Sequence, residues 1–357
     1  MDKKAILFLE DATTFKGETL GASGEAIGPV VVNTAVVGYQ EMITDSVNAG
    51  KMLVLTYPLI GNYGINEKFN ETDTARVSGL VIKEQSRIFS NWQAKTSLEE
   101  FLKKQNIVGI TGVDTRTLAV KIRDGGEMLG MISSENLNAG DAKNKLAEFA
   151  RRKNSLLEQI SAKEVRAIPG KGKKLAIIDL GISNSVLAQL SSLNFDITIF
   201  PYDTPAKEIL NLKPAGIVVS GGPENDLGLS KAIESVKEIL GRVPLFGFST
   251  GHEVIATAAG ASIKKMKTGH HGVNYPVKTP DSFKGEITAQ NHSYVVDEAS
   301  LNTKDIEILE KNINDNTIEK LTSKKLKFIS IQYCPASPGL GEVNGTLKEF
   351  AELVKNA

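Results

Sequence analysis

Cysteine is almost absent from this sequence, since Cys334 is the single one among 357 residues. One cysteine excludes an intramolecular disulfide and a cysteine-based metal cluster. It is typical of a reducing compartment, so we expect a cytoplasmic protein. Long apolar runs are also missing. No stretch approaches the roughly 18 apolar residues of a membrane span, and the short run near the start ends at Glu10, too early for the core of a signal peptide.

An excess charge of either sign is missing as well. Lysine and arginine number 42, aspartate and glutamate number 42, and the formal net charge is zero. This balance gives no reason to expect a nucleic acid or an anionic membrane as a partner. The 41% hydrophobic and 24% charged residues are ordinary for a globular protein, so a chain of this length can bury the cores of two domains.

The first half mixes short apolar runs with glycine-rich turns. These runs predict strands at 30–33, 52–56, 79–82 and 107–110, besides one at the N-terminus. A capping box at Ser97 predicts a helix to about residue 105, and another helix is expected over 114–123. We place an N-terminal domain at 1–150, an exposed linker at 151–172, and a C-terminal domain at 173–357.

The second half alternates between strand and helix patterns. Strands are predicted at 175–179, 196–200, 215–219 and 243–248, with a helix after each. This alternation favours an α/β fold with a parallel sheet flanked by helices, whose sites lie at the carboxyl ends of the strands. From 262 to 296 shorter strands with turns are expected. A buried strand at 326–331 and a helix at 346–355 complete the prediction.

The sharpest local pattern is Gly247-Phe248-Ser249-Thr250-Gly251, between a predicted strand and a predicted helix. Gly-x-Ser-x-Gly in that context is typical of a nucleophile elbow, which projects the central side chain above the sheet. The amide after Ser249 would lie at a helix N-terminus and could stabilise an oxyanion. A plain strand–helix turn with a capping serine explains the pattern about as well.

A nucleophilic serine needs a base, and the chain has four histidines: His252, His270, His271 and His292. His252 follows the elbow on the same helix, and we expect it to pack away from the reacting face. His270 and His271 are neighbours on a strand and should face opposite sides, so we expect no metal site. His292 lies near a predicted strand end and could face a cleft. Nothing in the sequence predicts a cofactor.

Two other segments follow predicted strands. Ser220-Gly221-Gly222-Pro223-Glu224 could bind an anion through its backbone amides, although a plain turn would explain it too. Cys334 follows the strand at 326–331. A lone cysteine there could be a nucleophile, but it is more often a small buried residue.

Taken together, these segments resemble the carbamoyl-phosphate synthase small subunit, and the second half resembles the wider class I glutamine amidotransferases. The resemblance implies a small-subunit-specific N-terminal α/β domain followed by an amidotransferase domain. It rests on segments from both halves of the chain: 9–11, 32–34, 38–41, 44–45, 55–58, 60–64, 114–116, 265–272, 288–292 and 336–339. Its partner would be a large synthase subunit, which makes carbamoyl phosphate for arginine and pyrimidine synthesis.

The resemblance also implies roles for particular positions. In the family a cysteine attacks the side-chain amide of glutamine, and a histidine paired with a glutamate transfers the proton. Ser249 stands at the cysteine position and Cys334 at the histidine position, and the glutamate after Pro335 is missing. The glutamine-pocket positions, several of them substituted, are Val47, Gly222, Glu224, Thr250, Glu253, Asn291, Ser293 and Tyr294.

The substitutions predict a glutaminase-deficient chain. A serine hydroxyl without a base is a poor nucleophile at neutral pH, and a thiol is a poor substitute for imidazole as a proton shuttle. A carboxylate at Glu224 or Glu253 would disfavour a developing oxyanion or the substrate carboxylate. The main prediction is therefore a pseudoenzyme that supports an ammonia-using large subunit. The alternatives are a working glutamine-dependent subunit and a separate serine hydrolase.

Overall fold

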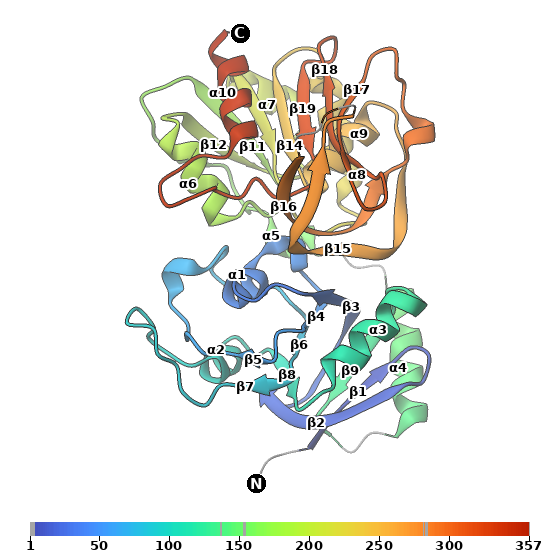
Figure 1. The fold of residues 1–357 in the computed structure, drawn as a ribbon. Helices are drawn as coiled ribbons and strands as arrows, with labels where there is room; N and C mark the ends of the chain where they lie inside the picture. Colours follow the sequence, from blue (N-terminus) through green and yellow to red (C-terminus); the bar gives the residue numbers. More distant parts are fainter. Residues whose placement is uncertain (1–3, 136–137, 153–154, 281, 283–284, 357) are drawn as a thin grey trace. The chain divides into compact units, whose positions relative to one another are not determined.

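The computed structural model describes residues 4–135, 138–152, 155–280, 282 and 285–356. The chain divides into two compact units (Figure 1). Unit 1 comprises Met1–Lys153 with Lys267–Gly272, and unit 2 comprises Asn154–Met266 with Val273–Ala357. Over the described residues, the helices are all too short or too polar to cross a membrane.

Unit 1 is built around a closed barrel of mixed strand direction, in the order β1-β2-β8-β6-β4-β3-β9. Residues distant in sequence close it, as where Glu18 of β2 pairs with Thr111 of β8. The predicted strands and helices of this half are confirmed, but their closure into a barrel was not predicted. The barrel strands are β1 (Lys4–Leu9), β2 (Thr14–Gly21), β3 (Glu25–Asn33), β4 (Met52–Leu55), β6 (Gly79–Val81), β8 (Val108–Thr111) and β9 (Leu129–Ser133).

Helices cover the barrel because alternate strand residues leave apolar side chains on both faces. Leu118 and Ile122 pack into one cluster with Leu7 and Met52. The predicted capping box is present, with Ser97 accepting from the Glu100 amide. The other elements of unit 1 are α1 (Tyr39–Thr44), η1 (Ser46–Asn48), β5 (Leu59–Ile60), η2 (Glu67–Phe69), β7 (Glu84–Gln85), α2 (Leu98–Lys104), α3 (Thr115–Gly125) and α4 (Ala139–Arg151).

The main sheet has ten strands in the order β10-β12-β11-β13-β14-β19-β18-β17-β15-β16 (Figure 1). Its centre, β12-β11-β13-β14-β19, is parallel, as the alternating pattern predicted. The strands are β10 (Arg166–Ile168), β11 (Lys174–Asp179), β12 (Asp196–Pro201), β13 (Gly216–Val219), β14 (Leu245–Phe248), β15 (Ile263–Lys278), β16 (Gly285–Val296), β17 (Glu307–Asn312), β18 (Ile318–Ser323) and β19 (Phe328–Ile331).

Both faces of the parallel region are buried. Leu175 and Ile177 pack with Phe350 of α10 on one face, whereas Ala176 and Ile178 pack with residues of α8 and α9 on the other. This two-sided burial explains why the strands are almost entirely apolar. The helices of unit 2 are α5 (Leu157–Ile160), α6 (Asn184–Ser192), α7 (Ala206–Asn211), α8 (Leu229–Ile239), α9 (Thr250–Ala258) and α10 (Gly345–Asn356), with η3 (Glu298–Ser300).

Two stretches differ from the sequence expectation. Short strands with turns were predicted over 262–296, but β15 and β16 are long, at 16 and 12 residues. Their buried and exposed residues do not alternate cleanly, so the pattern concealed a continuous strand. Part of the stretch predicted as a linker forms α5 and β10, and β10 pairs with β12 at a sheet edge.

The close approach of α9 to the sheet gives a first test. A Cβ atom at Gly251 would lie 2.1 Å from the carbonyl oxygen of Val219 and 2.8 Å from that of Ser220. Backbone atoms cannot move aside cheaply, so we expect Gly251→Ala to lower the free energy of unfolding by about 3 kcal/mol. Urea unfolding followed by circular dichroism would measure it.

Gly345→Ala is the matched control for this measurement. Gly345 begins α10, and a Cβ atom there would meet nothing within 4 Å. Alanine should therefore be neutral or slightly stabilising at this position. Equal effects of the two substitutions would contradict the close packing of α9 against β13.

Candidate functional site

Three of the segments singled out in the sequence meet at one edge of the unit 2 sheet. The strands β13, β14 and β19 are parallel neighbours, so their carboxyl ends share that edge. The loop Ser220–Glu224 follows β13, Ser249 follows β14, and Cys334 comes shortly after β19. This arrangement confirms the predicted edge, and β14 and β19 are labelled in Figure 1.

The elbow at Ser249 has the geometry that its sequence predicted. The backbone of Ser249 has φ 52° and ψ −124°. This is a left-handed conformation that residues other than glycine rarely adopt. Its amide donates to the carbonyl oxygen of Ile331 at 2.9 Å, and α9 begins at the next residue. Such a conformation costs about 1–3 kcal/mol and persists only where the surroundings enforce it.

The Ser249 hydroxyl makes no hydrogen bond to a histidine of the described residues. The side chain is 5% exposed and makes no capping hydrogen bond at the start of α9. Across the part of the chain that the structure describes, none of the four histidines forms a hydrogen bond with it. In this structure the elbow hydroxyl therefore makes no hydrogen bond to an imidazole of the described residues.

His252 has the packing role that was expected. Its ring is fully buried, and Nδ1 lies 2.8 Å from the hydroxyl of Ser330 on β19. Burial disfavours the imidazolium, and it lowers the pKa of His252 to about 3 although the hydrogen bond to Ser330 opposes the shift. His252 is thus neutral at physiological pH, and its ring is part of the buried core.

His292 does not face a cleft, so that expectation was wrong. The residue is fully buried on β16. Nδ1 lies 2.9 Å from the carbonyl oxygen of Tyr294, and Nε2 lies 2.8 Å from Oε1 of Gln290. Gln290 is two residues before His292, so the two side chains lie on one face of the strand. Both of these partners of the ring therefore belong to β16 itself.

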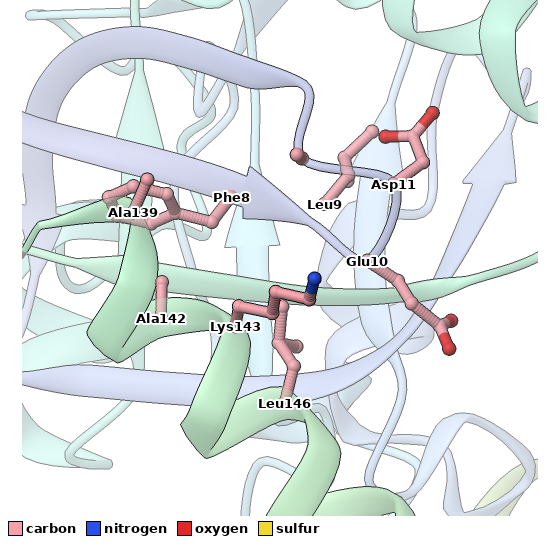
Figure 2. Close-up of a pocket in the computed structure, with 9 residues that line it drawn as sticks. Phe8, Leu9, Glu10, Asp11, Ala139, Ala142, Lys143 and Leu146 are labelled. Atoms are coloured by element: carbon pink, nitrogen blue, oxygen red, sulfur yellow. The ribbon is translucent and has the colours of Figure 1, made fainter.

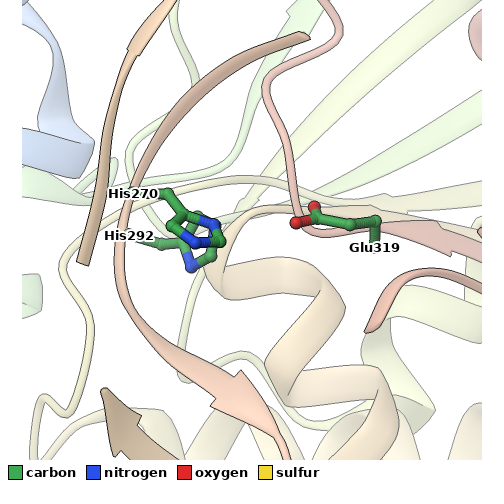
Figure 3. Close-up of side chains that lie close together, drawn as sticks. All are labelled: His270, His292 and Glu319. Atoms are coloured by element: carbon green, nitrogen blue, oxygen red, sulfur yellow. The ribbon is translucent and has the colours of Figure 1, made fainter. Parts of the chain in front are cut away.

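The adjacent histidines on β15 have different partners, as their alternation predicted. His271 Nε2 lies 3.1 Å from Oε1 of Glu127, and both side chains are buried. The same carboxylate oxygen accepts from the Gly269 amide at 2.7 Å. His270 instead lies near His292 and Glu319, with one potential ligand atom of each within 4.8 Å of the others (Figure 3).

The group of His270, His292 and Glu319 was not anticipated from the sequence. Two imidazoles and a carboxylate are a ligand set that zinc accepts. However, both ring nitrogens of His292 face oxygen atoms, and Glu319 Oε1 accepts from Asn312 Nδ2 at 3.1 Å. A metal ion needs a ring nitrogen whose lone pair points at it, so this arrangement fits a buried polar network.

The loop after β13 is tied closely to the elbow. Thr250 Oγ1 donates to the carbonyl oxygen of Gly222 at 2.6 Å. A Cβ atom at Gly222 would lie 2.0 Å from the carbonyl oxygen of Leu180, which explains why glycine stands there. Glu224 reaches β16, where its carboxylate accepts from the amides of Ser293 and Tyr294. These partners are backbone groups and had no sequence signal.

The remaining predicted positions are distributed over both units. Cys334 is half-buried, and its amide donates to the carbonyl oxygen of Ala289. Glu253 is buried and accepts from Gln332 Nε2 at 3.0 Å. Asn291 lies on β16, between His292 and Gln290. Val47 belongs to unit 1, where it is buried in η1.

A cavity in unit 1 was also not predicted. It has a volume of about 240 Å³ and lies between the turn after β1 and one side of α4 (Figure 2). It includes none of the positions named for the elbow or the glutamine pocket. Its lining residues are Phe8, Leu9, Glu10, Asp11, Ala12, Ala139, Ala142, Lys143 and Leu146.

The buried imidazole on α9 predicts a pH dependence of stability. The unfolded chain protonates His252 near its ordinary pKa of 6.5, whereas the folded chain does so only near 3. Its contribution to stability is complete above pH 6.5 and is lost as pH falls from 6.5 towards 3. Between pH 7.5 and 5.0 this residue should account for a loss of about 2 kcal/mol.

Urea titrations of the wild type and His252→Asn at both pH values would measure this loss. Asparagine can keep the hydrogen bond to Ser330 but does not titrate, so the variant should lose about 2 kcal/mol less than the wild type. Equal losses would contradict the burial of a neutral ring. Similar dependence on urea concentration in both proteins would confirm comparable unfolding.

Comparison with known proteins covers both halves of the chain. Residues 7–132 match the family described as "Carbamoyl-phosphate synthase small chain, CPSase domain", and residues 176–349 match "Glutamine amidotransferase class-I". A carbamoyl phosphate synthase small chain from Clostridium acetobutylicum is 39% identical over 351 residues, which cover 98% of this chain and 100% of that protein. The carbamoyl phosphate synthase pyrimidine-specific small chain of Bacillus subtilis is 40% identical over 353 residues, 99% of this chain and 96% of its own length. With its amidotransferase-like parallel sheet and matches along nearly its whole length, this chain belongs to the family of carbamoyl-phosphate synthase small chains.

Proposed function

We propose that this chain is a carbamoyl-phosphate synthase small subunit whose glutaminase site is inactive. It serves as a structural or regulatory partner of a large subunit that takes its nitrogen from free ammonia. The observation that supports this proposal is the elbow hydroxyl of Ser249, which has no imidazole hydrogen-bonded to it. Membership of the family supports a large subunit as the partner, and carbamoyl phosphate for arginine or pyrimidine synthesis as its product.

The chemical argument depends on how amide hydrolysis proceeds. The nucleophile must lose a proton as it attacks the side-chain carbonyl of glutamine, and the leaving ammonia must gain one. Cys334 stands where the family resemblance places the histidine, and its thiol is a poor proton shuttle near pH 7. Removing the nucleophile or base of a comparable triad lowers turnover about 10⁶-fold. We therefore expect glutamine hydrolysis to be negligible.

Two carboxylates support the same conclusion. Glu253 is buried in the first turn of α9, and Glu224 lies on the neighbouring loop. A carboxylate near a developing oxyanion disfavours the extra negative charge. Both residues thus add charge of the wrong sign to the side of the sheet where a tetrahedral intermediate would form.

One observation favours a second candidate function. Ser249 keeps the left-handed backbone of a nucleophile elbow, which a hydrolytic serine would need. A serine hydrolase, or a working glutamine-dependent subunit, would place a base against that hydroxyl when substrate binds. The buried contacts of His252 and His292 count against both, because either ring would have to leave its present partners.

Ser249→Ala tests whether the hydroxyl is catalytic. We expect the wild type and the variant to release glutamate from glutamine at the same background rate in the presence of the large subunit. Neither protein should hydrolyse an activated ester faster than the ester hydrolyses in buffer alone. Glutamate can be measured with a coupled dehydrogenase, and p-nitrophenyl acetate serves as the ester. Ammonia should support carbamoyl phosphate formation in both complexes.

Two results would contradict the proposal. Glutamate release at an ordinary enzyme rate, lost in Ser249→Ala, would establish a working amidotransferase. Ester hydrolysis lost in the same variant, without glutamate release, would establish a serine hydrolase. Gly345→Ala is the matched control, because it adds a methyl group far along the chain in α10 without steric contact.

Association with the large subunit should not depend on the elbow. We expect the wild type and Ser249→Ala to co-elute with the large subunit in size-exclusion chromatography to the same extent. The reason is that the substitution removes one hydroxyl from a buried residue, and that hydroxyl makes no capping hydrogen bond in α9. Absence of a complex for the wild type would contradict the proposed role.

A further inference from the structure

One carboxylate in unit 2 makes an unusual set of contacts. Glu224 Oε1 accepts from the Ser293 amide at 2.8 Å and from the Tyr294 amide at 3.1 Å, while Oε2 lies 3.0 Å from the Ser293 amide. Hydrogen bonds of an ionised carboxylate to backbone amides are roughly twice as strong as those between neutral groups. The contact therefore holds the loop after β13 firmly against β16.

The donors themselves form an anion-binding arrangement. In a regular strand successive amides point to opposite edges, so two neighbours rarely reach one acceptor. Ser293 and Tyr294 direct both of their N–H groups at the same carboxylate, which requires a local departure from strand geometry. Convergent neighbouring amides of this kind form a concave binding place for anions. Here the anion is supplied by the chain itself.

This amide pair is linked to the elbow through a single loop. Glu224 ends the loop whose Gly222 carbonyl oxygen accepts from Thr250, the first residue of α9. At the other end of the loop, the Ser220 hydroxyl accepts from the Leu180 amide. The loop is thus fixed beside Ser249, and the carboxylate it carries is directed at the two amides of β16.

We propose that Glu224 is a built-in occupant of a binding site for the carboxylate of a small amino acid, with glutamine as the ligand of matching chemistry. The Ser293 and Tyr294 amides would bind the α-carboxylate of that amino acid if Glu224 were absent. This inference rests on the proposed function, and it names what keeps glutamine out of the inactive site. The substitution thus blocks binding, in addition to the missing chemistry.

The competition is unequal because Glu224 is tethered. A group on a short loop reaches its partner at an effective concentration of about millimolar or higher, without loss of translational freedom. A free amino acid must exceed this concentration to displace it. Removing the carboxylate should therefore strengthen glutamine binding by at least about tenfold.

Titration calorimetry on the full-length chain tests the proposal. The variants are Glu224→Ala, which removes the carboxylate, and Glu224→Gln, which keeps the shape of the side chain but not its charge. Glu234→Ala is the matched control, since Glu234 is exposed on α8. The ligands are L-glutamine and L-glutaminol, in which a hydroxymethyl group replaces the α-carboxylate.

We expect Glu224→Ala to bind glutamine at least about tenfold more tightly than the wild type and Glu234→Ala, and to bind glutaminol no better than they do. Glu224→Gln should give a smaller gain, because its neutral amide is a weaker acceptor. Should Glu224→Ala fold poorly, a gain in Glu224→Gln alone would still support the proposal.

Unchanged glutamine binding in folded Glu224→Ala and Glu224→Gln would overturn the inference, as would equal gains for glutamine and glutaminol. Neither result would affect the proposed function, which depends on glutamate release. Conversely, glutamine hydrolysis by the wild type would overturn the proposed function and would itself require that glutamine enters despite Glu224. The binding and release measurements therefore distinguish the two failures.

Discussion

The tight contact between the elbow helix and its neighbouring strand is the constraint on which the rest of this site depends. Gly251 brings the start of α9 against the carbonyl oxygens at the end of β13, closer than any side chain allows. The parallel register of β13, β14 and β19 then places three loops at one edge of the sheet. The loop after β13 and the elbow are in direct contact there, through the hydrogen bond from Thr250 Oγ1 to the carbonyl oxygen of Gly222.

At that edge the molecule has the backbone form of a nucleophile elbow. Ser249 retains a strained backbone that positions a nucleophile, yet its hydroxyl lacks a side-chain partner among the described residues. The histidines that could have served it are built into the structure instead: His252 bonds with Ser330, and His292 with Gln290. The elbow itself is held by backbone contacts, such as the hydrogen bond from the Ser249 amide to the carbonyl oxygen of Ile331.

Features with local causes could be predicted from the sequence. The capping box at Ser97, the strand–helix alternation of unit 2 and the turn at Ser249 each depend on residues close together in the chain, and the structure contains all three. Closure of the barrel could not be predicted, because pairs such as Glu18 and Thr111 are distant in sequence. The partners of Glu224 could not be predicted either. They are backbone amides, which almost every residue type carries, so the sequence does not distinguish them.

The strained backbone at Ser249 has a consequence for how such a chain can change over time. Its conformation is one that glycine adopts without penalty, whereas serine carries a cost of about 1–3 kcal/mol. In a catalytic elbow, selection for the nucleophile opposes replacement. Where the hydroxyl has no task, that opposition is gone, and mutation towards glycine becomes the downhill direction. Serine at this position would then be retained only by descent, and replacement by glycine would carry no functional cost.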